Sequence, residues 1–163
     1  MDVVYLDRNN PGFPPELRKY PSDQTPKRIS VLGNLDILKE KKTAFFCSSK
    51  CPGDLIIKAR DLSRKWRDDG VLVISGFHSP LEKECLTILL QGRQPVIICP
   101  ARSIEIMRIR AEFKAPLADG RLLLLSPLPA REKRMTVRTA TIRNRFAAAM
   151  ADEVFIAHAA GSG

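Results

Sequence analysis

The chain has 163 residues, of which 44% are hydrophobic and 28% charged, as is typical of one soluble globular domain with a full core. Lysine and arginine (27) outnumber aspartate and glutamate (18), which gives a formal net charge of +9 and favours polyanionic partners such as nucleic acid or a phosphorylated ligand. No apolar run approaches the roughly 20 residues of a membrane-spanning helix, and residues 1–7 lack the features of an export signal, so we expect a cytoplasmic protein without membrane contact.

The first segment, residues 1–30, is rich in proline. This composition predicts an extended, turn-rich lead-in rather than a helix, because proline fixes its own backbone and cannot donate a backbone hydrogen bond. We expect the lead-in to lie over a single domain formed by residues 31–163.

From residue 43 onward, short apolar runs alternate with segments whose apolar residues recur at helical spacing. Strands are predicted at 43–48, 71–75, 95–99, 121–126 and 153–158, and helices at 54–68, 80–91, about 103–115 and around Arg143 and Arg145. The strands are continuous apolar runs, which is typical of strands covered on both faces. The sequence therefore predicts an α/β fold: a doubly wound, mainly parallel Rossmann-like sheet with helices on both faces.

Ligands of such sheets bind beyond the carboxyl ends of the strands, so the loops after the predicted strands are the candidate site. These loops are rich in small, hydroxyl and basic residues, which suit phosphate oxygens. Taken singly, each residue is equally well explained as a turn or a solvated side chain, but together on one edge they favour an anion pocket. The candidate phosphate-binding residues in these loops are Ser48, Ser49, Lys50, Ser75, Gly76, His78 and Arg102.

The stretch Thr141–Phe146 adds Arg143, Asn144 and Arg145 to this candidate site, and it leads into a run of small residues. We interpret it as the beginning of a helix, where the arginines would add to free backbone N–H groups and the positive dipole end. Taken alone, the two arginines are more simply explained as part of a solvent-exposed helix face. Residues 131–145, however, contain six basic residues and a single acid, which strengthens the anion hypothesis.

Several motifs of catalytic and cofactor chemistry are absent from the sequence. It contains no Gly-x-Gly-x-x-Gly after the first strand, no P-loop and no Gly-x-Ser-x-Gly elbow. Cys47 and Cys51 are four positions apart, but no second Cys/His pair completes a zinc site. We therefore expect reduced thiols, no metal, no cofactor and no enzymatic activity.

Six short segments follow one another along the chain, and their order identifies a protein family more specifically than any single segment does. They are Tyr20-Pro21, Leu32-Gly33-Asn34, 46–50, 73–77, 123–127 and Arg143-Asn144-Arg145. In this order they resemble the Tyr-Pro, Leu-x-x-x-Gly-Asn, Val-Gly-Ser-Arg, Val-Val-Ser-Gly-Leu, Leu-Leu-Ser-Glu and Arg-Asn-Arg motifs of the DNA-processing protein A family (DprA, also called Smf). The resemblance covers about residues 20–160.

The resemblance implies a Rossmann-like domain whose pocket binds phosphate or the backbone of single-stranded DNA. It also implies a role in DNA uptake, processing or recombination, through the loading of a RecA-type recombinase, as in natural transformation. The family's site residues carry over to Ser48, Ser49, Lys50, Ser75, Gly76, Arg143, Asn144 and Arg145.

The sequence also departs from the family pattern: the glycine of Gly-Ser-Arg is lost, and Pro127 replaces the glutamate of Ser-Glu. Aromatic residues make up only 6% of the chain, which argues against extensive base stacking. Two alternatives therefore stay open. One is a small-nucleotide sensor or hydrolase of the related LOG-type group, whose Pro-Gly-Gly-x-Gly-Thr motif is absent, and the other is a domain that acts through a protein partner or as a homodimer.

Overall fold

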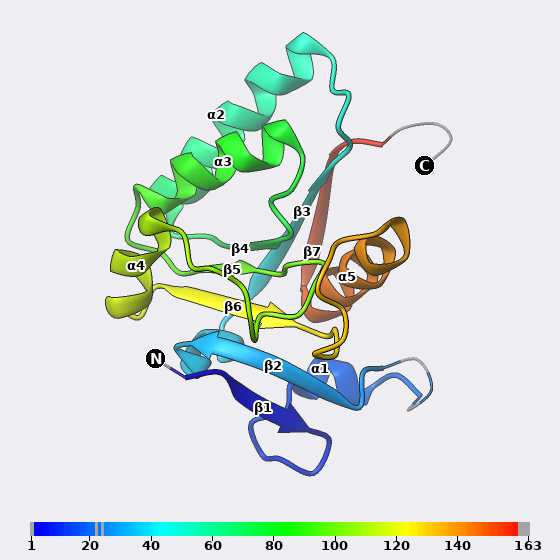
Figure 1. Ribbon diagram of the computed structural model, residues 1–163. Coiled ribbons are helices and arrows are strands. Elements are labelled where there is room, and N and C mark those ends of the chain that lie inside the picture. The colour runs from blue at the N-terminus through cyan, green and yellow to red at the C-terminus, as the bar shows by residue number, and fades with distance from the viewer. Residues whose placement is uncertain (1, 22, 24, 160–163) are drawn as a thin grey trace.

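The computed structural model of the protein describes residues 2–21, 23 and 25–159. A seven-stranded sheet forms its centre, with helices on either side (Figure 1). The strands are β1 (Val4–Asp7), β2 (Arg28–Gly33), β3 (Lys42–Cys47), β4 (Leu72–Ser75), β5 (Val96–Ile98), β6 (Leu122–Ser126) and β7 (Glu153–His158). The helices are α1 (Pro15–Arg18), the 3-10 helix η1 (Leu35–Lys39), α2 (Gly53–Asp69), α3 (Pro80–Leu90), α4 (Ala111–Ala118) and α5 (Val137–Met150).

Two clusters of buried apolar residues lie on opposite faces of the sheet, because successive strand residues point to opposite sides. Leu122 and Leu124 of β6 pack with residues of α2, α3 and α4, whereas Leu123 and Leu125 pack with residues of α1, η1 and α5. The predicted α/β architecture with helices on both faces is therefore confirmed.

The strand order is β1-β2-β6-β5-β4-β3-β7. The pairings from β6 to β7 are parallel, but β2 pairs antiparallel with both β6 and β1. The sheet is thus mixed, and the prediction of a mainly parallel sheet is confirmed only in part. β2 and β3 are not neighbours in this order, and the connection between them through η1 spans residues 34–41.

Residues 1–30 have more regular structure than the extended, turn-rich lead-in that the sequence predicts. This segment supplies β1, α1 and the first residues of β2, and its side chains Leu6, Phe13 and Leu17 are buried. Proline does not prevent the short helix, because Pro15 lies in the first turn, where no intrahelical bond needs its N–H. The segment is therefore part of the domain and its core rather than a covering strap.

Two helix boundaries also differ from the prediction. Only α4 forms in the region where a helix was expected at about 103–115, and α5 begins at Val137, several residues before Arg143. The side chain of Thr136 accepts a hydrogen bond from the N–H of Thr139, and the Thr139 side chain accepts one from the N–H of Thr136. This capping box sets the start of α5. Arg143 and Arg145 therefore lie in the middle of the helix, and their predicted place at its beginning is wrong.

The described helices also bear on membrane association. None of the helices in the part of the chain that the structure describes combines the length and the apolar character needed to cross a membrane. The longest helix, α2, carries charged residues along its length and pairs several of them on its surface.

Candidate anion-binding site

The carboxyl ends of β3, β4, β5 and β6 lie at one edge of the sheet, which we call the rim together with the loops that follow these strands. Helix α5 contacts both β3 and β4. A parallel sheet presents its loops for ligand binding at this edge, so the rim is where the sequence-predicted residues should meet.

Arg143 of α5 is the central side chain of the rim, and it is only 5% exposed. Its Nη1 donates to the carbonyl oxygen of Cys99, 3.1 Å away, and its Nε donates to Oδ1 of Asn144, 2.7 Å away. Burial lowers the pKa of the guanidinium, and interactions with Cys99 and Glu82 oppose this shift. Cys99 supplies no counter-charge, because burial raises the pKa of its thiol to about 12.

No carboxylate forms an ion pair with Arg143 among the residues that the structure describes. A buried charge is costly unless it is paired or fully hydrogen-bonded. Arginine remains charged in proteins and binds phosphate through two parallel hydrogen bonds. The burial of Arg143 at the rim is therefore the strongest local indication of an anion site.

Gly76 makes room for this arginine. A Cβ atom at Gly76 would lie 1.8 Å from Nη1 of Arg143, so only glycine lets the guanidinium pack against the end of β4. Ser75 is fully buried, and its Oγ accepts a hydrogen bond from the N–H of Phe77, a non-glycine residue at φ 49°. Gly76 therefore makes room for Arg143, and the Ser75 hydroxyl bonds within its own loop and does not face a ligand.

Glu82, which the sequence analysis did not assign to the site, occupies donors expected to bind a ligand. Its carboxylate accepts hydrogen bonds from the backbone N–H groups of Cys47, His78 and Ser79 at 2.9, 2.9 and 3.1 Å. Ser79 and Glu82 form the capping box of α3. The Ser-x-x-Glu spacing was the sequence signal for this arrangement, but the contact with Cys47 depends on the tertiary structure.

The loop after β3 carries Ser48, Ser49 and Lys50. The N–H of Ser48 donates to the carbonyl oxygen of His158, while the Ser48 hydroxyl is buried without a partner in the described residues. Ser49 and Lys50 are exposed. This loop offers an unsatisfied hydroxyl and a solvent-facing ammonium group next to the Glu82 contact.

His78 follows β4 and is exposed at the rim. Partial burial lowers its pKa below 6.5, and the positive charges of Lys83 and Arg143 add to this shift, while Glu82 opposes it. The guanidinium of Arg143 is thus one of the charges that act on the His78 imidazole.

The structure brings only part of the predicted set together. Gly76 and Asn144 adjoin Arg143, and the charge of Arg143 acts on His78. No contact within the described part of the chain joins Ser49, Lys50 or Arg102 to this guanidinium.

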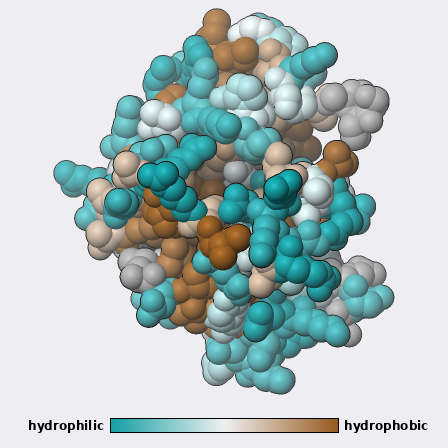
Figure 2. Space-filling view, in the orientation of Figure 1, coloured by the Kyte–Doolittle hydropathy of each residue, from teal (hydrophilic) through white to brown (hydrophobic). Residues whose placement is uncertain are grey.

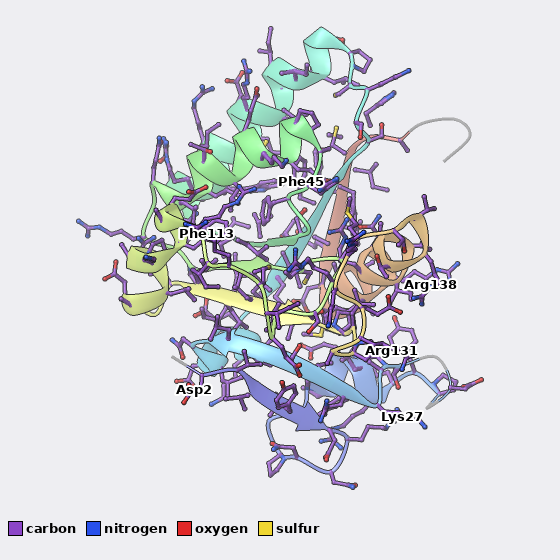
Figure 3. All side chains as sticks on the ribbon, viewed as in Figure 1. Asp2, Lys27, Phe45, Phe113, Arg131 and Arg138 are labelled. Atoms are coloured by element: carbon purple, nitrogen blue, oxygen red, sulfur yellow. The ribbon has the colours of Figure 1, made fainter. Side chains whose placement is uncertain are left out.

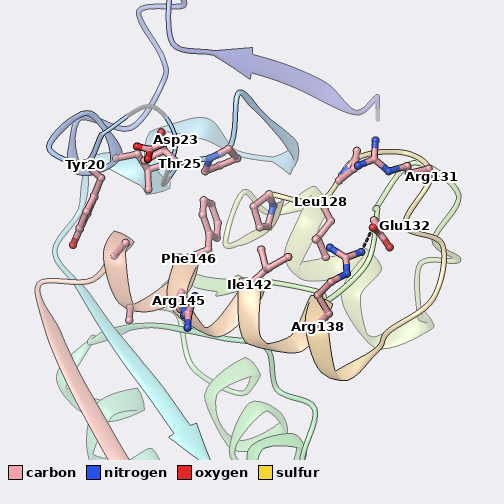
Figure 4. Close-up of a pocket in the computed structure, with 16 residues that line it drawn as sticks. Tyr20, Asp23, Thr25, Leu128, Arg131, Glu132, Arg138, Ile142, Arg145 and Phe146 are labelled. Carbon is pink, nitrogen blue, oxygen red and sulfur yellow. Dashed lines mark hydrogen bonds and ion pairs between the residues drawn. The ribbon is translucent and has the colours of Figure 1, made fainter.

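Two of the predicted site residues, Arg102 and Arg145, lie away from the Arg143 contacts. The carbonyl oxygen of Arg102 accepts a hydrogen bond from Ser126 Oγ, and its Nε is buried without a partner in the described residues. Arg145 lines a cavity between α5 and the lead-in (Figure 4). The expectation that Arg143 and Arg145 point into one pocket therefore does not hold.

The surroundings of the rim are strongly polar. Hydrophilic residues cover most of the side formed by α5 and the lead-in in Figure 2, and Lys27, Arg131 and Arg138 lie on that same side in Figure 3. Phe45 and Phe113 instead belong to the buried cluster beneath α2, α3 and α4. Among the residues that are described, no group of three or more His, Cys, Asp or Glu side chains could hold a metal ion.

Comparisons with known proteins agree with the α/β fold. The family model of DNA recombination-mediator protein A matches residues 4–163. The fold and the match define a Rossmann-like domain of the DNA-processing class. The chain belongs to the DNA recombination-mediator protein A family. No relative is found among the curated proteins.

Two solved structures share the fold. The X-ray structure of DNA processing protein A from Streptococcus pneumoniae is 18% identical, with a TM-score of 0.75 over 94% of this chain and 53% of that one. DNA processing protein A from Helicobacter pylori, whose structure concerns its single-stranded DNA binding mode, is 19% identical, with a TM-score of 0.69 over 94% of this chain and 68% of that one. The chain thus spans about half the length of the Streptococcus pneumoniae protein.

Proposed function

We propose that the protein binds single-stranded DNA through its phosphates at the rim, as a cytoplasmic, non-enzymatic participant in DNA processing and recombination. The observation that carries this proposal is the buried guanidinium of Arg143, which forms no ion pair with a carboxylate in the described residues. Membership of the family supports it. The single-stranded DNA binding described for the Helicobacter pylori protein supports it as well.

In this proposal, Arg143 anchors one phosphate, and its direction is fixed by Gly76, Asn144 and the carbonyl oxygen of Cys99. Lys50 and His78 contribute further positive charge or hydrogen-bond donors from the neighbouring loops. Binding through phosphates alone does not read sequence, so the protein would accept many single strands. The bound strand would be passed to a RecA-type recombinase, the partner that the family resemblance implies, and a homodimer would carry two such rims.

The test is a titration of labelled oligothymidylate at several salt concentrations, with double-stranded DNA and mononucleotides as competitors. We expect affinity to fall steeply with salt, because each phosphate contact on a single strand contributes about 0.7 to the slope of log K against log salt. Lys50→Ala should reduce that slope by roughly this amount. Sedimentation of the same samples reports the oligomeric state.

Lys114→Ala is the matched control. Lys114 is exposed on α4, which precedes β6 and so lies near the amino end of that strand, away from the rim (Figure 1). Its replacement removes the same charge from the protein and should leave the salt slope unchanged. The proposal is contradicted if Lys50→Ala and Lys114→Ala change the salt slope equally. It is also contradicted if duplex DNA displaces the oligonucleotide at equal concentration.

A further inference from the structure

A second concave site lies on the side of α5 that Arg145 faces (Figure 4). It is a cavity of about 860 Å³ between α5, the lead-in and the loop after β6, and this volume is within the range of small-ligand sites. None of the rim residues Ser48, Gly76 and Arg143 lines it. The cavity is therefore separate from the proposed phosphate site.

The walls of the cavity combine apolar surface with positive charge. Ile142 and Phe146 of α5 and Leu128 form its apolar part, and Arg131, Arg138 and Arg145 also line it. In Figure 4, Arg131 and Arg138 lie at one end and Tyr20 lies at the other.

The three arginines differ in their partners. Arg138 forms an ion pair with Glu132, which also lines the cavity. Arg131 and Arg145 are exposed and form no ion pair within the described ranges. Two cations thus remain available to an anionic ligand at this site.

Tyr20 provides an aromatic surface at the cavity. The chain contains two tyrosines, and both are partly exposed, Tyr20 by 42% and Tyr5 by 38%. The ring of Tyr5 is already covered by the guanidinium of Arg28 at 4.3 Å, and its hydroxyl donates to Glu105. Tyr20 has no such cation–π partner in the described residues, so its ring can accept a stacked base.

We infer that this cavity binds an unpaired nucleotide. Its base lies against Tyr20 and the apolar wall of Ile142 and Phe146, and its phosphate faces Arg145. Stacking on an aromatic ring beside basic side chains is how single-stranded nucleic acid is held without regard to sequence. Asp23, which also lines the cavity, offers a carboxylate acceptor to the edge of the base.

The inference rests on the proposed function, because the same strand can supply both nucleotides. The rim and the cavity are separated by α5, and a helix with its side chains is about 10–12 Å across. A strand anchored by Arg143 therefore reaches the cavity within a few nucleotides. A free mononucleotide presents the same chemistry, and the experiment distinguishes the two sources.

The experiment follows the tyrosine ring signals by NMR. Two tyrosines make the spectrum simple, and Tyr5→Phe assigns it. The protein is titrated separately with thymidine monophosphate and with oligothymidylate. We expect the ring signals of Tyr20 to shift with either ligand by more than those of Tyr5, which lines a neighbouring hollow.

Binding measurements on variants complete the test. Tyr20→Ala should weaken oligothymidylate binding roughly 5- to 150-fold, the range found when a stacking aromatic is removed, with no change in the salt slope. Tyr5→Ala is the matched control and should change affinity less than about twofold by the same reasoning. Arg145→Ala should reduce the salt slope by about 0.7.

The outcomes separate this inference from the proposed function. If the oligonucleotide binds and Lys50→Ala weakens it while the Tyr20 signals do not move, the inference is overturned and the rim site stands. If the monophosphate shifts Tyr20 but no oligonucleotide binds, the cavity is a mononucleotide site and the single-stranded DNA function is overturned. If only a polyglutamate peptide shifts Tyr20, the cavity is a protein-binding surface and the inference is overturned.

Discussion

The two sides of α5 place neighbouring arginines in opposite environments. Arg143 is buried against Gly76 and bonded to the carbonyl oxygen of Cys99, whereas Arg145 is exposed at the cavity. Two positions along a helix are rotated by about 200°, so the arginines of Arg-Asn-Arg cannot share one direction. The comparison teaches that the two arginines of one short motif lie in different surroundings on the same helix, one buried and one exposed at the cavity.

The two environments also predict effects of different size. A buried guanidinium interacts through a medium of low effective dielectric and keeps one orientation. An exposed arginine is screened by salt and solvent and samples many rotamers. We therefore expect changes around Arg143 to alter both folding and binding, and changes at Arg145 to alter binding alone.

The largest effect is expected from Gly76→Ala. The new methyl group would overlap Nη1 of Arg143, so the guanidinium must move and the buried contacts must rearrange. Overpacking of this kind costs about 1–3 kcal/mol of unfolding free energy. The free energy of unfolding, measured with denaturant, and the affinity for oligothymidylate should both decrease. Gly53→Ala, where an added Cβ meets nothing within 4 Å, is the control, and an unchanged Gly76→Ala protein would show that Arg143 is not held as described.

A smaller effect tests whether the two arginines act independently. Arg143→Ala should weaken oligothymidylate binding roughly 10- to 150-fold, as expected for loss of a charged hydrogen-bonding group. Arg145→Ala should weaken it less. If they serve separate sites, the double variant should show the sum of the two free-energy losses to within about 0.5 kcal/mol. A larger coupling energy, measured by the same titration, would place both arginines on one phosphate.

The smallest effect is a pH dependence from His78. Its pKa lies below 6.5 in the folded protein, mainly through partial burial, so the folded state binds fewer protons than the unfolded state in this range. Stability should therefore decrease slightly as the pH falls through 6.5. A bound phosphate would raise the pKa of His78, and affinity should then increase over the same fall in pH.

NMR titration of His78 with and without oligothymidylate checks the direction of this shift. His78→Asn should remove this pH dependence of binding and leave the salt slope at neutral pH unchanged. A pKa of His78 that stays the same on binding would show that the phosphates do not approach this loop.

The alternation of strands and helices after residue 43 could be predicted because its signals are local. Continuous apolar runs and helical spacing identify β3 to β7 and helices α2 and α3 within a few residues of their ends, and they indicate that a helix carries Arg143 and Arg145. The antiparallel β2 was missed because its partner β6 lies far along the chain, with Ser30 opposite Ser126. Strand β1 was missed as well, because it is defined by its pairing with β2.

The sequence by itself determined the fold class, the edge at which the loops gather and the presence of the Arg-Asn-Arg motif. Only the tertiary structure decided how that edge is used. The start of α5 at its Thr136 cap sets the direction of each arginine, and the packing of α5 on the sheet buries Arg143 beside Gly76. The carboxylate of Glu82 accepts a hydrogen bond from the N–H of Cys47, which lies 35 residues before it in the chain. Helix phase and burial depend on contacts between distant segments, and no local pattern encodes them.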